Sequence, residues 1–490
     1  MSLISVSNLT FCYEGSYDNI FENVSFQIDT DWKLGFIGRN GRGKTTFLNL
    51  LLGRYEYRGS ISAGVNFEYF PYAVDDKSQL TIDVVDSVGG NFQLWEVQRE
   101  LSKLDVSEDV LYRPFETLSN GEQTKVLLAA LFLKENSFLL IDEPTNHLDV
   151  EARELVAEYL NSKKGFILVS HDRAFLDSCV DHILSINRAN IEVQSGNFST
   201  WYYNKQLKDS FELKTNQKLK KEIKRLEGAA RQRADWSYKV EATKIGNHVY
   251  DRGYVGHLAA KMMKRSKAIE RRQKNMIEEK SKLLKNIEKA EPLKIATAAH
   301  HAGRLVELKD VSLFYGTRKV CENVSFTIEQ GDRIALWGRN GSGKSSIIKL
   351  ICGEKIDYTG DFYKAANLKI SYVPQDTSFL KGSLNDYAER NNIDISLFLA
   401  ILRKLDFERV QFEKDMSDFS AGQKKKVLIA RSLCENANLF VWDEPLNYID
   451  ILSRMQIEEL LTEYRPTILF VEHDISFCEN IATKIVRLQA

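Results

Sequence analysis

Two short segments of the chain combine glycines with a lysine and a hydroxyl residue at a spacing that suits phosphate binding. One reads Gly38-Arg-Asn-Gly-Arg-Gly-Lys-Thr45, and the other reads Gly338-Arg-Asn-Gly-Ser-Gly-Lys-Ser345. Glycines let backbone N–H groups turn inward around phosphate oxygens, and a helix that follows adds positive potential at its N-terminus. In this pattern Lys44 and Lys344 reach the β and γ phosphates, while Thr45 and Ser345 ligate magnesium. The segments therefore predict two sites for ATP with Mg²⁺.

A pair of carboxylates ends an apolar run downstream of each glycine segment, in Phe138-Leu-Leu-Ile-Asp-Glu143 and in Leu439-Phe-Val-Trp-Asp-Glu444. The first acid of each pair, Asp142 or Asp443, suits the magnesium shell. The second acid, Glu143 or Glu444, is placed to orient or polarise an attacking water. The pattern predicts hydrolysis of the bound nucleotide.

A histidine follows a further apolar run in each case. His171 comes 29 residues after Asp142, and His473 comes 30 residues after Asp443. A lone histidine is most often structural, but two histidines at matched positions favour a contact with the γ-phosphate.

These residues belong to two copies of one sequence pattern. Glu22-Asn-Val-Ser-Phe-Gln-Ile28 returns as Glu322-Asn-Val-Ser-Phe-Thr-Ile328, and the offset is between 300 and 302 at the glycine, carboxylate and histidine motifs. Each copy starts with short alternating apolar stretches and then reaches an apolar strand, a glycine loop and a helix. We expect an α/β fold with two tandem nucleotide-binding domains, at residues 1–203 and 304–490, joined by a linker at 204–303.

The linker has no counterpart elsewhere in the chain, and it is basic. Residues 205–289 hold 24 Lys and Arg against 11 Asp and Glu, whereas the whole chain holds 67 against 68. A basic segment between acidic flanks indicates an anionic partner, with nucleic acid as the first candidate. A solvated spacer would carry similar charge, so charge alone leaves both interpretations open.

Apolar residues in the linker recur at helical spacing. Met262, Ile269, Met276 and Leu283 follow one another every seven residues, while Leu219, Ile223 and Leu226 follow a four-then-three step. Two long helices could pair along such a seam, and a helix of 30 to 40 residues would be about 45 to 60 Å long. Glycines at 246, 253 and 256 interrupt any helix between them. The pattern predicts a basic α-helical hairpin with an irregular tip.

Other features of the sequence exclude several classes of protein. The chain is 43% hydrophobic with only 7 prolines, which indicates globular domains, and no apolar stretch approaches the roughly 20 residues that cross a bilayer. Its six cysteines are scattered and form no Cys-x-x-Cys pair, which fits a reduced cytosolic setting and argues against zinc. We expect a cytoplasmic protein with no membrane partner.

Two further segments identify a family resemblance. Leu118-Ser-Asn-Gly-Glu-Gln123 and Phe419-Ser-Ala-Gly-Gln423 resemble the signature motif of ATP-binding cassette (ABC) ATPases. With the glycine segments, the carboxylate pairs and the histidines, the resemblance covers nearly all of both repeats. It implies ABC-type P-loop nucleotide-binding domains whose signature segments close over the nucleotide held by the opposite domain.

The resemblance implies a role for specific residues of each copy. Tyr13 and Tyr315 match the aromatic residue that stacks on adenine. The implied nucleotide contacts of the first copy are Tyr13, Gly38, Arg39, Asn40, Gly41, Arg42, Gly43, Lys44, Thr45, Thr46, Ser119, Asn120, Gly121 and Glu122. Those of the second copy are Tyr315, Gly338, Arg339, Asn340, Gly341, Ser342, Gly343, Lys344, Ser345, Ser346, Gln375, Ser420, Ala421, Gly422 and Gln423. The implied metal ligands are Thr45, Asp142, Ser345, Gln375 and Asp443.

Two composite sites follow from this arrangement. The first site is expected to join Lys44, Asp142, Glu143 and His171 to Ser420 and Gly422, and the second is expected to join Lys344, Asp443, Glu444 and His473 to Ser119 and Gly121. The chain would then work as a monomer with an intramolecular cassette dimer.

A few positions depart from the family pattern. Tyr72 stands where the second copy has Gln375, the residue that usually touches magnesium and water. Asn120 and Ala421 replace the first glycine of the signature. The second copy also reads Pro445-Leu-Asn-Tyr-Ile-Asp450 in place of Pro-Thr-Asn-His-Leu-Asp. Because both catalytic glutamates are present, hydrolysis is expected at both sites, which should be unequal.

The narrower resemblance is to the ABC-F subfamily, whose tandem cassettes bind ribosomes through the linker. Asp142-Glu-Pro-Thr-Asn-His-Leu-Asp149 has the form typical of that subfamily. Only 46 positions separate Tyr72 from Leu118, which leaves no room for an arm insertion, and the linker is long. The chain is therefore similar to the antibiotic-resistance branch of the Lsa and Vga type. That branch displaces lincosamides, pleuromutilins and group A streptogramins from the ribosomal peptidyl transferase centre.

The resemblance implies a 70S ribosome as partner, with ribosomal RNA and P-site transfer RNA contacted through residues 204–303 in the exit (E) site. A housekeeping ABC-F translation factor would act at the same ribosomal site without conferring resistance, and the long linker tip, rich in glycine and aromatic residues, favours resistance. A transporter ATPase would need membrane partners and has no use for a basic hairpin of some 85 residues between its cassettes.

Overall fold

The computed structural model describes residues 2–14, 19–90, 92–146, 148–187, 190–242, 264, 271–272, 292–339, 341–407 and 409–488. The chain folds into two compact units, Met1–Trp201 with Ala290–Ala490, and Tyr202–Lys289. The first unit holds both copies of the repeat, which we call cassette one (residues 2–201) and cassette two (residues 292–488).

Two sheets form the frame of cassette one. The antiparallel sheet has the order β2 (Phe21–Asp29), β1 (Leu3–Phe11) and β4 (Arg58–Ser62). The second sheet has the order β5 (Asn66–Phe70), β6 (Ser137–Asp142), β7 (Phe166–Val169), β3 (Lys33–Ile37), β8 (His182–Asn187) and β9 (Asn190–Ser195). Its strands are parallel except for the last pair. Strands β6 and β7 are almost continuous apolar runs because both faces of this sheet are covered.

Helices cover the parallel sheet of cassette one. They are α1 (Lys44–Leu51), α2 (Thr81–Gly89), α3 (Leu94–Lys103), α4 (Asn120–Leu131), α5 (Val150–Asn161) and α6 (Arg173–Cys179), with short 3₁₀ turns at Glu108–Tyr112 and Phe115–Thr117. Phe36, Phe47 and Leu48 are fully buried in a core that joins α1 to both sheets. This packing fixes the start of α1 next to the end of β3, which is where the first glycine segment lies.

Cassette two repeats this plan. Its antiparallel sheet has the order β11 (Arg318–Glu329), β10 (Arg304–Tyr315) and β13 (Asp357–Lys364). Its parallel sheet has the order β14 (Ile370–Val373), β15 (Leu439–Asp443), β16 (Ile468–Val471), β12 (Arg333–Trp337) and β17 (Lys484–Arg487). The helices are α9 (Lys344–Cys352), α10 (Leu384–Arg390), α11 (Ile395–Lys404), α12 (Ala421–Cys434), α13 (Ile451–Tyr464) and α14 (Ile475–Ile481), with 3₁₀ turns at Arg409–Glu413 and Met416–Asp418.

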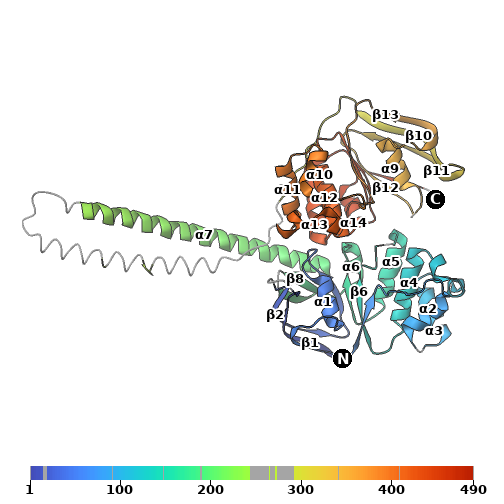
Figure 1. The fold of residues 1–490 in the computed structure, drawn as a ribbon, viewed down its shortest axis with the longest axis horizontal. Coiled ribbons are helices and arrows are strands. Elements are labelled where there is room, and N and C mark those ends of the chain that lie inside the picture. The colour runs from blue at the N-terminus through green and yellow to red at the C-terminus, as the bar shows by residue number, and fades with distance from the viewer. Residues whose placement is uncertain are drawn as a thin grey trace, which may run out of the picture. The chain divides into compact units, whose positions relative to one another are not determined.

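The two kinds of element separate within cassette two. Strands β10, β11 and β13 lie on one side of its ribbon, and helices α10 to α14 lie on the other (Figure 1). The predicted α/β fold with two copies of one domain is confirmed by these matching sheets and helices.

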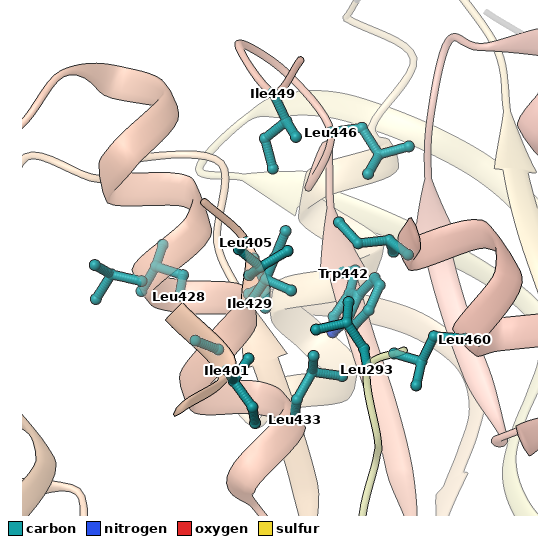
Figure 2. Close-up of a cluster of buried hydrophobic side chains, with 14 of the residues drawn as sticks. Leu293, Ile401, Leu405, Leu428, Ile429, Leu433, Trp442, Leu446, Ile449 and Leu460 are labelled. Carbon is teal, nitrogen blue, oxygen red and sulfur yellow. The ribbon is translucent and has the colours of Figure 1, made fainter. Parts of the chain in front are cut away.

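Cassette two begins earlier than the predicted boundary at residue 304. Leu293 and Ile295 are buried in its hydrophobic core. Figure 2 shows Leu293 beside Leu433, Trp442 and Leu460. The main chain follows the same path, because the N–H of Ala298 donates to the carbonyl of Ala437 at 2.9 Å. Residues 292–303 were assigned to the linker because that stretch lacks a repeat partner, yet they contribute to the packing of cassette two.

The linker begins with a single long helix, α7 (Phe198–Ala242), of 45 residues. At 1.5 Å per residue it is about 67 Å long. Its first turn starts inside the predicted first domain, where Phe198 and Trp201 are buried and in ring contact. The predicted first helix of the hairpin is thus present (Figure 1). The predicted tip, with its glycines at 246, 253 and 256, lies outside the described residues, as does most of the predicted second helix.

Candidate functional site

Each glycine segment forms a tight loop between a strand and a helix. Gly41 and Gly43 have φ values of 83° and 93°, and Gly341 and Gly343 have values of 85° and 87°. L side chains rarely adopt this left-handed conformation, so the loops require glycine there. At Gly43 the space is closed as well, because a Cβ atom would lie 2.6 Å from Cγ2 of Ile20.

The lysine of each loop curls back over its own main chain. Nζ of Lys44 donates to the carbonyls of Gly38 at 2.7 Å and Arg39 at 3.3 Å. Nζ of Lys344 makes the same two contacts, with Gly338 at 2.7 Å and Arg339 at 2.9 Å. The predicted residue Asn340 lies outside the described residues. Both ammonium groups are therefore held against the main chain of the loop whose N–H groups would cradle a phosphate.

The magnesium candidates meet beside each loop. The hydroxyl of Thr45 donates to Oδ2 of Asp142 at 3.4 Å, and the hydroxyl of Tyr69 donates to the same oxygen at 3.0 Å. Burial raises the pKa of Asp443, and a hydrogen bond from the Ser345 side chain opposes that shift. Oδ1 of Asp443 is buried without a hydrogen-bond partner among the described residues. A buried carboxylate oxygen with free lone pairs beside a hydroxyl suits a hard cation such as Mg²⁺.

The two catalytic candidates share an unusual backbone. Glu143 and Glu444 follow β6 and β15 directly and have φ values of 51° and 47°. Non-glycine residues in this region carry strain that the surrounding fold must hold, and such residues cluster at functional sites. His171 Nε2 lies 3.2 Å from Oε1 of Glu143, and His473 Nε2 lies 3.5 Å from Oε1 of Glu444. The matched histidines therefore contact the glutamates in both cassettes.

The electrostatic surroundings of the two glutamates differ. Burial, reinforced by the neighbouring Asp142, raises the pKa of Glu143 to about 8. Burial also lowers the pKa of His171 well below its ordinary value. Burial alone would raise the pKa of Glu444, but hydrogen bonds from His473 and Gln375 lower it overall. Burial thus favours the protonated form of Glu143, whereas hydrogen bonds favour the ionised form of Glu444.

Two side-chain amides hold the same oxygen of Glu444. Nε2 of Gln375 donates to its Oε2 at 2.8 Å, and Nδ2 of Asn447 donates to the same oxygen at 2.7 Å. Asn447 was not among the predicted site residues, although Asn146 occupies the matching position of the first copy and could have revealed it. Tyr72, which replaces Gln375 in cassette one, is 36% exposed.

The signature segments begin helices α4 and α12. Ser119 and Ser420 are the N-caps, and their hydroxyls accept from the backbone N–H of Glu122 and Gln423, respectively. Both make capping boxes, in which the side chain of the third residue bonds back to the cap. Asn120, Gly121, Ala421 and Gly422 follow in the first turns. The N-terminus of a helix favours an anionic group such as a phosphate.

One cavity joins the second loop to the first signature segment. Its volume is about 840 Å³. The predicted site residues that line it are Ser119, Asn120, Gly121, Glu122, Arg339, Gly341, Gly343, Lys344, Ser345, Ser346, Gln375, Glu444 and His473. Asp443 lies behind the lining, fully buried. The structure thus brings together the members of the predicted second composite site, and the cavity volume is within the range of known small-molecule pockets.

The first loop is in direct contact with cassette two, beside Gly422 of the second signature segment. Nδ2 of Asn40 donates to the carbonyl of Tyr448 at 2.7 Å. A Cβ atom on Gly422 would clash with that same carbonyl oxygen and lie 3.1 Å from Nδ2 of Asn40. Arg39 and Arg42 each lie 3.5 Å from the carboxylate of Asp406. The first loop is therefore held against cassette two by Asn40, Arg39 and Arg42.

Asp406 and Tyr448 were missed in the sequence. Asp406 recurs as Asp105 at the matching position of cassette one, so a search for repeated acidic residues would have found it. Tyr448 contacts the loop only through its carbonyl, a group that every residue carries, and no sequence pattern could have indicated it.

The predicted adenine-stacking residues are both on the surface. Tyr13 is 42% exposed and Tyr315 is 48% exposed. The hydroxyl of Tyr13 lies 2.8 Å from Oγ1 of Thr46, the last predicted contact of the first loop. The ring of Tyr13 is held edge-on by Phe11 at 5.1 Å and Tyr55 at 5.8 Å. An exposed aromatic face anchored beside the loop is available for stacking.

Within the described part of the chain, no helix combines the length and apolar character needed to cross a lipid bilayer. Groups of three or more histidine, cysteine or acidic side chains that could hold a metal ion are likewise absent from the described residues.

The sequence model of the ABC transporter family matches residues 21–146 and 321–447. A similar protein is the ribosome protection protein VmlR of Bacillus subtilis, which is 27% identical over 491 residues, covering 98% of this chain and 85% of that protein. The ATP-binding protein Uup of Buchnera aphidicola is also 27% identical, over 504 residues, with 99% and 80% covered. Among solved structures, the archaeal ribosome recycling factor aABCE1 has a TM-score of 0.63 at 17% identity, with 99% and 87% covered.

Proposed function

Because the chain belongs to the ABC transporter family and is an ATPase with two cassettes in tandem, we propose that it is an ABC-F protein that acts on ribosomes. In this proposal it binds the 70S ribosome at the E site. Its linker then displaces lincosamide, pleuromutilin and streptogramin A antibiotics from the peptidyl transferase centre.

The observation that carries the proposal is the helix α7. It is a continuous helix of 45 residues that starts at the end of cassette one, and it carries 11 of the 24 Lys and Arg residues of 205–289. Basic helices of this length can reach along an RNA surface and contact phosphates. The similarity to the ribosome protection protein VmlR runs through 98% of the chain, so it includes this linker.

We assign the nucleotide contacts as the sequence suggests them. Lys44 and Lys344 would hold the phosphates of two ATP molecules, and Tyr13 and Tyr315 would stack on the adenines. Thr45, Asp142, Ser345, Gln375 and Asp443 would hold Mg²⁺, which when bound neutralises charge on the β and γ phosphates. The unpartnered Oδ1 of Asp443 supports this assignment for cassette two.

We assign Glu143 and Glu444 to the attacking water and His171 and His473 to the γ-phosphate. Glu444 is ionised and held by Gln375 and Asn447, so it is ready to accept a proton from water. Glu143, whose pKa is raised to about 8, is a weaker base at neutral pH because most molecules carry it protonated. Cassette two is therefore the faster site in this proposal.

ATP binding would act as a switch on the linker. Two bound ATP molecules close the cassettes as an intramolecular dimer in a monomeric chain, and closure sets the position of the linker helices. The tip would then contact ribosomal RNA and P-site transfer RNA, and hydrolysis would reopen the cassettes and release the protein. All of these steps would take place in the cytoplasm.

A housekeeping translation factor is the second candidate. Uup is as similar to this chain as VmlR is, at 27% identity, and its name specifies only ATP binding. Such a factor would use the same cassettes and the same linker on stalled ribosomes, without any effect on drugs.

Drug resistance in a susceptible bacterium separates the two candidates. Expression of the chain should raise the minimum inhibitory concentrations of lincomycin, tiamulin and virginiamycin M. The variant with Glu143→Gln and Glu444→Gln should not raise them. Resistance to erythromycin alone would indicate a macrolide-protecting protein, and normal ribosome binding without any resistance would favour the housekeeping factor.

Sedimentation tests the switch itself. With ATP, the Glu143→Gln, Glu444→Gln variant should stay on 70S ribosomes, whereas the unchanged chain should dissociate. Equal binding of the two proteins would contradict the switch. A chain shortened between Gly246 and Gly256 should keep its ATPase activity and lose protection; loss of both would indicate a folding defect.

A further inference from the structure

Cassette two contains a buried lysine that none of the assigned roles uses. Lys425 lies on α12, in the second turn after the signature segment, and its side chain is only 2% exposed. Burying a lysine is costly unless its ammonium group is hydrogen-bonded or paired. Its contacts should therefore explain why it is there.

Lys425 donates to two backbone carbonyls that belong to different parts of the cassette. Nζ lies 2.9 Å from the carbonyl of Pro374 and 3.3 Å from the carbonyl of Asp443. Pro374 follows β14, and Asp443 ends β15, the neighbouring parallel strand. One ammonium group thus links the ends of two adjacent strands.

The residues that follow these carbonyls are the ones that meet in the site. Gln375 comes directly after Pro374, and Glu444 comes directly after Asp443. Their side chains are joined by the 2.8 Å hydrogen bond from Nε2 of Gln375 to Oε2 of Glu444. Glu444 also has the strained φ of 47°, so its side-chain direction depends on how firmly the main chain before it is held.

Cassette one has no equivalent. The repeat aligns Lys425 with Thr124, whose side chain is shorter and carries no charge. It also aligns Gln375 with Tyr72. Cassette two therefore has both the lysine and the glutamine, and cassette one has neither.

A buried acid accompanies the lysine. Glu472, which aligns with Ser170, is 3% exposed and accepts a hydrogen bond of 2.7 Å from the N–H of Leu446. Burial lowers the pKa of Lys425, and the nearby charges of Glu472, Asp443 and Glu444 oppose that shift. Lys425 could thus be there only to balance the charge of Glu472, and a test has to separate that role from a role in hydrolysis.

We propose that Lys425 is a positioning residue for ATP hydrolysis in cassette two, where its ammonium group holds the main chain beside Gln375 and Glu444. The proposal rests on the assignment of Glu444 to the attacking water. Lys425 touches neither nucleotide nor water in this role; it keeps the base and the glutamine in contact.

Steady-state ATPase kinetics in two backgrounds test the proposal. In the Glu143→Gln background, where turnover reports cassette two, Lys425→Thr should lower kcat at least tenfold and change KM for ATP less than twofold. Lys425→Arg, which keeps the charge and the donors, should stay within threefold of the parent. In the Glu444→Gln background, where turnover reports cassette one, Lys425→Thr should change kcat less than twofold. An unchanged kcat in the first background, or equal losses in both, would overturn the proposal.

A double variant separates positioning from charge balance and guards against misfolding. Lys425→Thr with Glu472→Ser reproduces the pair of cassette one and removes both buried charges together. It should fold with a thermal midpoint close to that of the parent and still show the tenfold loss in kcat. Recovery of kcat in the double variant would mean that Lys425 only balances Glu472, and the proposal would be wrong.

The assignment of Glu444 is tested separately. If Glu143→Gln with Glu444→Gln hydrolyses ATP as fast as Glu143→Gln alone, the site assignment fails whatever Lys425 does. If that double variant is inactive and Lys425→Thr has no effect, only the positioning role fails.

Discussion

The two cassettes share a fold but bury their charges in different places. In cassette one Glu100 of α3 is 1% exposed and is surrounded by Lys103 at 2.9 Å, the hydroxyl of Tyr159 at 2.8 Å, and Lys163. In cassette two the repeat aligns Glu100 with Ile401 and Tyr159 with Leu460. Both of these residues are buried in an apolar core (Figure 2).

Next to the nucleotide site it is cassette two that buries charged side chains and cassette one that has neutral ones. Cassette two has Lys425 and Glu472 behind its carboxylates, whereas cassette one has Thr124 and Ser170 there. The hydroxyl of Ser170 lies 3.5 Å from that of Thr145. At the Glu100 and Tyr159 positions, among the helices, buried charged and polar groups in one cassette are thus replaced by apolar side chains in the other, and either kind of packing fills the space. Beside the strand ends the ionic version also fixes the main chain, so that difference is expected to affect catalysis.

The largest difference in stability should come from a lysine that both cassettes have. Nζ of Lys426 lies 2.9 Å from Oδ2 of Asp450, and both side chains are at most 4% exposed. Lys426→Met would leave a buried carboxylate unpaired, so we expect a loss of about 3–5 kcal/mol in cassette two. The matching Lys125→Met in cassette one should cost less than about 1 kcal/mol, because Lys125 lines the cavity and is only half-buried.

Hydrogen exchange can measure this contrast within one chain. Amides of α12 should exchange faster in Lys426→Met, and those of α4 should be almost unchanged in Lys125→Met. Similar effects of the two substitutions would contradict the unequal burial of the two lysines.

Unequal ATP turnover is the next largest expected effect. At pH 7 about a tenth of molecules would carry Glu143 ionised if its pKa is about 8. Glu444→Gln, which leaves cassette one as the active site, should therefore lower turnover about tenfold. Glu143→Gln should lower it about twofold or less. Steady-state ATPase assays of the two variants check the order, and a larger loss for Glu143→Gln would reverse our assignment of the faster site.

The pH profiles of the same variants sharpen the comparison. A raised pKa means that Glu143 becomes ionised only as pH rises through about 8. Turnover of Glu444→Gln should accordingly rise about tenfold between pH 7 and pH 9. Turnover of Glu143→Gln should be almost flat over this range, because the pKa of Glu444 is lowered. Parallel profiles would indicate that the two glutamates have similar environments.

Acid stability should show the smallest difference. Burial alone would raise the pKa of Glu100, but hydrogen bonds from Lys163, Lys103 and Tyr159 lower it from 4.5 to about 2. The resulting stabilisation is complete above pH 4.5 and is lost as pH falls toward 2. We expect this to contribute about 1 kcal/mol to cassette one. Glu100→Gln should abolish that contribution, visible as a smaller loss of unfolding free energy between pH 4.5 and pH 3 than in the unchanged chain.

Much of the site could be predicted because phosphate chemistry restricts the residues that serve it. The glycine loops, their lysines and the carboxylates at the ends of β6 and β15 lie where the sequence indicated. The long helix α7 was also predictable, since heptad spacing is a local property of the chain.

Interactions that depend on tertiary packing could not be predicted. The carbonyl of Tyr448, the carbonyls that Lys425 links, and the burial of Leu293 all depend on segments distant in sequence. Every residue has a backbone carbonyl, so the sequence does not indicate which carbonyl makes a contact. A leucine outside the repeat is assigned to the linker until the residues that pack against it are known. The unequal pKa values of Glu143 and Glu444 have the same origin, because burial and neighbouring donors determine them.

The two ends of the linker are fixed differently from the tethers that join most domains. At one end Trp201 is buried in ring contact with Phe198. At the other end Leu293 lies in the core beside Trp442 (Figure 2). Trp442 belongs to β15, the strand that ends at Asp443. A flexible tether would absorb a displacement of either cassette as slack. Because Trp201 and Leu293 are buried in the cassettes, neither residue can shift independently of the cassette that holds it.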